Sequence, residues 1–226
     1  MPIEPRYLLL ALLLALPFAV TAGVKEEKRA QAAVAVLREV QSVPDIEIPE
    51  SLLSKAYAIA VIPDVVKVGL VVGGRRGKGL ISVRQMDGTW SNPAYISITG
   101  GSFGFQAGVQ SADIILVFRT QRGVDNLVSG KFTLGADASV AAGPVGRQAS
   151  AATDIELKAE ILAYARTRGL FAGIALDGSA LAIDYDAIER VYGRGTSPRA
   201  LFEGRVKGAP TFIVDFRDQL EEQTSR

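Results

Sequence analysis

The sequence contains no histidine and no cysteine in its 226 residues, and these absences remove several kinds of chemistry. There can be no Ser-His-Asp triad, no cysteine nucleophile, no zinc site built on Cys or His, and no haem ligated by His. Disulfides are excluded as well, so stability has to come from packing and hydrogen bonds. We therefore expect no metal and no cofactor, whereas carboxylate and lysine chemistry is not excluded by the composition.

The chain also lacks an excess of charge of either sign. Its 25 Lys and Arg residues are balanced by 24 Asp and Glu residues, which gives a net charge of +1. Net charge therefore predicts no affinity for nucleic acid or for an anionic surface, and any such affinity has to come from a local patch. Because 48% of the residues are hydrophobic, a single domain of roughly 200 residues can bury a substantial core.

Residues 1–22 have the pattern of a secretory signal peptide. Arg6 forms a thin positive region, and residues 7–20 form an apolar stretch that is short for a membrane span. Val20-Thr21-Ala22 places small or modest residues before Gly23. We expect cleavage there, which leaves residues 23–226 as one secreted, periplasmic domain with no membrane span. The alternative is an uncleaved N-terminal anchor.

The remainder of the chain predicts an α+β fold. Helices are expected at 25–41, 121–128, 184–192 and 212–222, with Asp184 capping the third. Short apolar segments typical of strands occur at 57–62, 67–72, 80–84, 94–99, 103–109, 114–118, 132–140, 155–161, 170–176 and 180–183. The last two bracket the Asp177-Gly178 turn, which predicts a short hairpin. Glycines in several of these segments favour tight bends. We therefore expect a strongly curved, mostly antiparallel sheet, closed or nearly closed into a barrel, with helices at both ends of the chain.

The most informative segment is VVKVGLVVGGRRGKGLISVRQMDGTW, residues 65–90. Two apolar, strand-like stretches flank a glycine-rich run at residues 73–79, which we interpret as a turn. Arg75, Arg76 and Lys78 lie within this run, where backbone N–H groups and cations could bind a phosphate or a lipid headgroup. The run is not a P-loop, because Gly79 stands where Ser or Thr is required. The alternative is a solvated hairpin tip.

Further motifs follow this segment in a fixed order: Trp90-Ser91-Asn92-Pro93-Ala94, Gly100-Gly101, Thr133-Leu134-Gly135, Val140-Ala141-Ala142-Gly143-Pro144, Thr167-Arg168-Gly169-Leu170-Phe171-Ala172-Gly173 and Leu176-Asp177-Gly178-Ser179. Over residues 50–195, this order resembles the SYLF domain family, lipid-binding modules of bacteria, fungi and animals. The resemblance implies non-enzymatic binding of membrane lipid, with phosphoinositide-type anionic headgroups, so that the partner is anionic phospholipid or a membrane surface.

The alternative function is a structural or protein-interaction module of the cell envelope. Fungal members of the family that the chain resembles are linked to actin, which a secreted protein would not meet. Salt-dependent affinity for anionic vesicles would separate lipid binding from this alternative, since exposed charges are screened by salt.

Two other features bear on lipid contact. Phe103, Phe105 and Phe171 lie beside glycines, so they could line an apolar groove for acyl chains or fill the centre of a small barrel. In animal members of the resembled family an amphipathic N-terminal helix is implicated. Here the helix expected at 25–41 has mixed charge and no bulky aromatics, which favours packing on the core over membrane contact.

No residue is assigned a catalytic role. Asp137, Asp184 and Asp186 are the carboxylates considered for acid–base chemistry, but the sequence gives no way to pair them, and Asp184 is explained as a helix cap. Arg147 follows a stretch that matches the resembled family closely. It could pair with a carboxylate such as Asp137 or Asp154, or contribute to an anion site.

Overall fold

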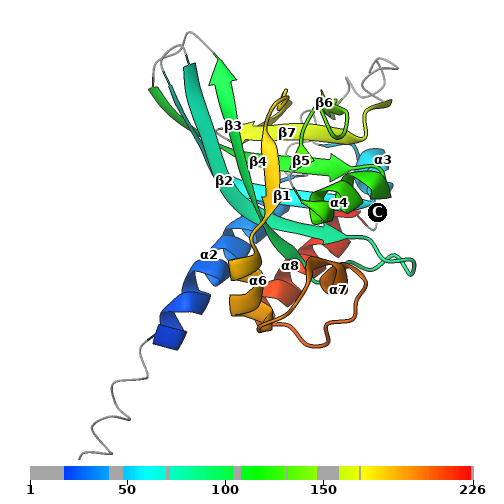
Figure 1. The fold of residues 1–226 in the computed structure, drawn as a ribbon. Helices are drawn as coiled ribbons and strands as arrows, with labels where there is room; N and C mark the ends of the chain where they lie inside the picture. Colours follow the sequence, from blue (N-terminus) through cyan, green and yellow to red (C-terminus); the bar gives the residue numbers. More distant parts are fainter. Residues whose placement is uncertain are drawn as a thin grey trace, which may run out of the picture.

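The computed structural model describes residues 18–40, 48–69, 72–103, 108–130, 132–146, 158–167 and 169–224. Within these ranges one large sheet is curled into a half-barrel, and helices from the two ends of the chain pack together beneath it (Figure 1). This arrangement confirms the predicted α+β class with a curved, mostly antiparallel sheet. None of the described helices combines the length and the apolar character that crossing a membrane requires.

The sheet has the strand order β5-β9-β3-β2-β1-β4-β7-β6, with β8 paired to β7. Its strands are β1 (Ala58–Gly69), β2 (Val72–Val83), β3 (Ala94–Phe103), β4 (Gly108–Phe118), β5 (Phe132–Thr133), β6 (Val140–Ala142), β7 (Ile161–Thr167), β8 (Leu170–Gly173) and β9 (Ala180–Ile183). The helices are α2 (Phe18–Arg38), α3 (Glu50–Leu53), α4 (Gln121–Ser129), α6 (Tyr185–Tyr192), α7 (Pro198–Phe202) and α8 (Thr211–Thr224). Among the pairs of strands that the structure describes, only β6 and β7 run parallel.

One face of the sheet is covered by α2 and α8, and we call it the helix face. Tyr95 of β3 lies on this face, since its hydroxyl donates to the Glu26 carbonyl of α2 at 3.1 Å. The two helices are joined by a hydrogen bond of 3.1 Å from Arg38 Nε to Gln219 Oε1. The C-terminal end of α8 is held by Trp90, whose Nε1 donates to Thr224 Oγ1 at 3.0 Å.

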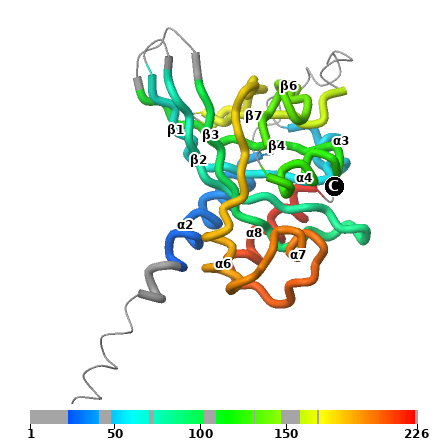
Figure 2. The backbone as a smooth tube through the Cα atoms, viewed as in Figure 1, coloured from blue at the N-terminus to red at the C-terminus, as the bar shows by residue number. Residues whose placement is uncertain are grey.

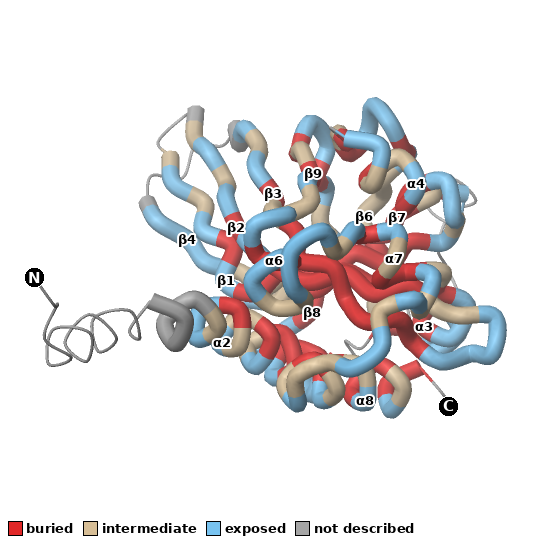
Figure 3. Tube along the Cα trace, turned by 60° about the horizontal axis from the view of Figure 1, so that its bottom comes forward, coloured by how far each residue is buried: buried red, intermediate tan, exposed pale blue. Residues whose placement is uncertain are grey.

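The opposite face lines the inside of the half-barrel, and we call it the inner face. Because side chains alternate along a strand, Phe118 and its neighbours at even positions of β4 point inward. Phe118 packs there against Phe132 of β5, with ring centroids 6.4 Å apart. Buried residues are concentrated in the part of the sheet that lies between α4 on one side and α2 and α8 on the other (Figure 3).

Two glycines of β2 allow the sheet to curl sharply. The pairing of β1 with β2 shifts in register between Val61 and Val66. At this place a Cβ on Gly79 would lie 2.1 Å from the Val61 carbonyl oxygen, and a Cβ on Gly77 would lie 2.6 Å from Val65 Cγ2. Both distances are too short for any side chain, so only glycine permits this approach of the two strands.

Beyond this curl, β3, β2, β1 and β4 continue away from the helices as a four-stranded extension (Figure 2). We call it the distal sheet, comprising residues 65–69, 72–76, 100–103 and 108–112. β9 pairs with β3 only over Ile96–Thr99, and β7 pairs with β4 only over Asp113–Phe118. Within the described residues, the distal sheet therefore has two free edges.

Several sequence-based expectations for the strands are wrong. The segment 73–79 is not a turn, because it belongs to β2 and its pairing with β1 continues to Gly69 opposite Gly73. The segment 132–140 is not one strand, because Gly135 at φ +87° turns the chain between β5 and β6. The segments 170–176 and 180–183 do not form a hairpin, because β8 pairs with β7 while β9 pairs with β3 and β5.

Other expectations were closer to the structure. The helices expected at 25–41, 121–128, 184–192 and 212–222 are confirmed as α2, α4, α6 and α8. Asp184 caps α6, since its Oδ1 accepts from Ala187 N at 3.2 Å. Of the strand expected at 155–161, residues 155–157 lie outside the described residues, and the rest of the expectation is wrong because residues 158–160 are not in a strand and β7 begins only at Ile161.

The curl generates a prediction about stability. We expect Gly79→Ala to lower the free energy of unfolding by roughly 1–3 kcal/mol, because the added methyl group would overlap the Val61 backbone. Gly101→Ala is the matched control, since a Cβ there meets no atom within 4 Å. Urea denaturation of both variants measures the difference. Equal midpoints for the two would contradict the requirement for glycine at position 79.

Candidate functional site

The three cations singled out in the sequence do not form one cluster. They lie on β2, where side chains alternate between the two faces of the sheet. Arg75 therefore faces the inner side, whereas Arg76 and Lys78 face the helix side. A turn would have allowed all three to meet one ligand, but a strand does not.

Lys78 is already engaged by a carboxylate. Its Nζ lies 2.8 Å from Asp184 Oδ2, and the same oxygen lies 3.3 Å from Arg29 Nη1 of α2. Burial acts to raise the pKa of Asp184, but the hydrogen bonds from Lys78 and Ala187 N, with the nearby charges of Lys78 and Arg29, hold that pKa below its usual value. Lys78 therefore helps to tie α2, β2 and α6 together.

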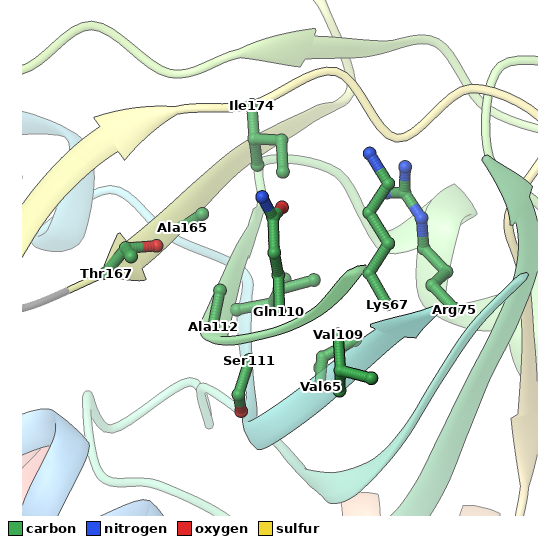
Figure 4. A pocket seen from close by; sticks show the side chains of 11 residues that line it. Val65, Lys67, Arg75, Val109, Gln110, Ser111, Ala112, Ala165, Thr167 and Ile174 are labelled. Carbon is green, nitrogen blue, oxygen red and sulfur yellow. The ribbon is translucent and has the colours of Figure 1, made fainter. Parts of the chain in front are cut away.

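Arg75 has a different environment. Its Nε is buried and has no hydrogen-bond partner, and burial lowers the pKa of its guanidinium. The residue paired with Arg75 across β1 and β2 is Lys67, so both side chains leave the sheet on the inner face (Figure 4). Within the described part of the chain, no hydrogen bond or ion pair engages either cation. Two like charges opposite each other on antiparallel strands are destabilising.

The two cations lie beside a hollow of about 590 Å³ on the inner face of the distal sheet. Figure 4 shows their side chains rising from the sheet on one side of this hollow, with Ile174 and Gln110 across from them. The described residues that line it are Val65, Lys67, Arg75, Val109, Gln110, Ser111, Ala112, Ile114, Ala165, Thr167 and Ile174. This lining contains two cations and no carboxylate, together with several aliphatic side chains.

Of the three phenylalanines considered for an apolar groove or for the centre of a barrel, the structure describes the side chain of Phe171 alone. Phe171 is buried in the core, with 4% of its surface exposed. Phe103 ends β3, but its side chain lies outside the described part, as does all of Phe105. The apolar wall of the hollow comes instead from aliphatic residues, among them Val65, Ile114 and Ile174.

The helix face of the distal sheet carries exposed apolar side chains. Val66, Val68 and Val109 are 39%, 51% and 72% exposed. Val66 is paired with Arg76, which is itself exposed, and Val68 is paired with Val109. Three valines and a cation thus lie together on a part of the sheet that α2 does not cover.

The N-terminal helix packs on the sheet, as its mixed charge favoured. Glu26 of α2 is only 1% exposed and accepts from Arg190 Nε at 3.1 Å and Nη2 at 2.9 Å. Arg29 stacks over the Tyr95 ring at 5.2 Å from its centroid. In the conformation described, these contacts engage Glu26 and Arg29 of the helix with the rest of the fold.

Two of the three carboxylates considered for catalysis, Asp184 and Asp137, have structural partners, whereas Asp186 is exposed. Asp184 is bound as described above, and Asp137 Oδ2 accepts from Thr133 N at 2.7 Å in the turn after β5. Among the residues with described positions, no group of three or more acidic side chains is placed to hold a metal ion. Arg147 and Asp154 lie outside the described part of the chain.

Comparison with known proteins identifies the family. The family described as "Ysc84: Las17-binding protein actin regulator" matches residues 99–223. The chain belongs to the Ysc84 family, which is the SYLF family that the motifs predicted. The match begins in β3 and extends through α8, and it therefore covers more than half of the chain.

Individual relatives agree with this assignment. The chain is 35% identical over 176 residues to LAS seventeen-binding protein 3 of Saccharomyces cerevisiae, covering 76% of this chain and 38% of that protein. It is 36% identical over 161 residues to SH3 domain-containing YSC84-like protein 1 of Mus musculus, covering 69% of this chain and 47% of that protein. The chain thus spans less than half the length of these curated relatives.

Proposed function

We propose that this protein binds anionic membrane lipid without chemical turnover, through the distal sheet. The observation that carries the proposal is the pair Lys67 and Arg75, two cations that face each other on the inner face with no carboxylate partner among the described residues. A buried, unpaired arginine nitrogen is costly unless a hydrogen-bond acceptor reaches it. Phosphate and carboxylate groups are the acceptors that match a guanidinium best.

Exposed apolar side chains support contact with a membrane and not only with a soluble anion. Val66, Val68 and Val109 lie on the other face of the same thin extension, beside Arg76. Membrane-surface binding is strengthened when apolar burial and cationic attraction act together. The distal sheet offers both, since its exposed valines and its cations occur within a few residues of each other.

A protein-interaction module of the cell envelope is the second candidate. Two findings favour it: the family description names Las17 binding and actin regulation, and the distal parts of β3 and β4 leave free strand edges in the described structure. A free strand edge can pair with an extended segment of a partner. Binding of that kind depends little on the anionic lipid content of a vesicle, and this difference separates the two candidates.

The lipid proposal predicts the behaviour of a triple variant. We expect Lys67→Gln/Arg75→Gln/Arg76→Gln to weaken flotation with phosphatidylglycerol-containing vesicles at least severalfold in low salt, because each cation near an anionic surface contributes up to roughly 1 kcal/mol. Lys78 is left in place, since its charge is bound to Asp184. The effect should shrink as ionic strength rises.

The matched control removes the same number of charges elsewhere. Lys55, Arg194 and Lys207 are exposed and lie outside the distal sheet, so Lys55→Gln/Arg194→Gln/Lys207→Gln should float like the parent protein. If both triple variants float equally well, the assignment of lipid binding to the distal sheet is wrong. If the parent protein does not float with the vesicles, the lipid proposal itself is wrong and the protein-interaction candidate is favoured.

We further propose that the protein is exported and acts in the cell envelope. The support is the sequence pattern of residues 1–22. Helix α2 begins at Phe18, so cleavage before Gly23 would shorten it by five residues. The contacts of α2 described above begin at Glu26 and would be preserved.

Export predicts a specific N-terminus. Mass spectrometry of the protein isolated from its native cells should find Gly23 or a close neighbour as the first residue. Intact Met1 in the mature pool would show that the segment is retained.

A further inference from the structure

Two properties of the cations beside the hollow on the inner face favour an anionic ligand. Lys67 and Arg75 are like charges on directly opposed positions of antiparallel strands, an arrangement that is unfavourable by itself. Arg75 Nε is also buried and lacks a partner. An anion placed between the two side chains would relieve the repulsion and satisfy the buried nitrogen in one step.

The rest of the hollow is suited to a hydrocarbon chain. Val65 and Ile114 are buried in its wall, and Ala165 and Ile174 lie further from the two cations on β7 and after β8. Figure 4 shows Ala165 and Ile174 on the side of the hollow away from Lys67 and Arg75, with Gln110 between the two sides. A volume of about 590 Å³ lies within the range of pockets that hold small ligands.

Neighbouring carboxylates do not neutralise the site. Asp113 projects from the helix face of β4, where Arg166 Nη2 holds its Oδ2 at 2.7 Å. Glu39, directly after α2, is bound by the same arginine. Neither Asp113 nor Glu39 therefore pairs with Lys67 or Arg75 in the described structure.

We propose that this hollow binds a single-chain amphiphile with an anionic headgroup, held by Arg75 and Lys67, with its chain along the Val65–Ile114–Ala165–Ile174 wall. This inference rests on the proposed lipid function but goes beyond it. It assigns a cavity for one acyl chain, whereas vesicle binding needs only the surface of the distal sheet. The shared headgroup chemistry is a carboxylate or a phosphate monoester.

Calorimetry on the full-length protein tests the inference with probes kept below their micelle concentrations: dodecanoate, dodecyl phosphate, inorganic phosphate and the neutral detergent dodecyl maltoside. We expect the two anionic amphiphiles to bind. Shortening the chain to decanoate should weaken binding several-fold for each methylene removed. Inorganic phosphate should bind much more weakly than dodecyl phosphate, since it lacks the chain.

Two kinds of variant separate headgroup from chain. Arg75→Gln and Lys67→Gln should each weaken dodecanoate binding roughly tenfold or more, as expected for loss of a hydrogen bond to a charged group. Arg194→Gln is the control with the same charge change at an exposed position outside the distal sheet. Ala165→Leu fills the apolar part and leaves both cations, so it should weaken dodecanoate while leaving any phosphate binding unchanged. Thermal unfolding of each variant confirms that it is folded.

The outcomes distinguish this inference from the proposed function. Vesicle flotation without binding of either anionic amphiphile would overturn the cavity assignment and leave the membrane proposal standing. Binding that is unchanged in Arg75→Gln and Lys67→Gln would place the amphiphile elsewhere and also overturn it. Equal binding of dodecyl maltoside would contradict a requirement for an anionic headgroup. Failure of both flotation and amphiphile binding would remove the lipid function altogether.

Discussion

The close approach of β2 to β1 at Gly77 and Gly79 is the constraint on which the rest of the structure depends. Because these two positions carry no side chains, β1 and β2 can lie close together at the register shift after Val61, and the sheet can curl there. The curl separates the sheet into a part buried between helices and a distal part that extends past them. It also leaves room on the inner face, where any larger residue at position 77 would meet Val65 and Ile98.

Charged residues have different roles in these two parts of the sheet. Close to the helices, Asp184 binds both Lys78 and Arg29, and buried Glu26 binds Arg190, so these charges hold α2 in place. Ion pairs of this kind contribute to positioning because removing one partner leaves the other without compensation. On the inner face of the distal sheet, the cations have no such partners in the described structure. The same types of residue therefore anchor the fold in one place and offer an anion site in another.

The sequence predicted the helices and the curved α+β sheet better than it predicted the site. Helix α6 was recognisable because Asp184 caps it and Gly193 ends it. The role of residues 73–79 was misjudged because glycine signals both a turn and a close approach of strands, and local sequence does not distinguish the two. Because residues 73–79 were interpreted as a turn, the sequence did not predict that Arg75 lies opposite Lys67. This pairing follows only from the observed register. The exposure of Val68 could not be predicted from the sequence either, since it depends on how far α2 and α8 cover the sheet.

The most direct test of this account is to observe the Arg75 side chain by NMR while the protein is titrated with dodecyl phosphate. If the buried Nε of Arg75 is the anion site, its Nε–Hε resonance should shift and become protected from exchange with water as the ligand is added. The Arg76 resonance, on the opposite face, should change little. An unchanged Arg75 signal under saturating ligand, with shifts only at exposed arginines, would contradict the claim that the distal sheet holds an anion on its inner face.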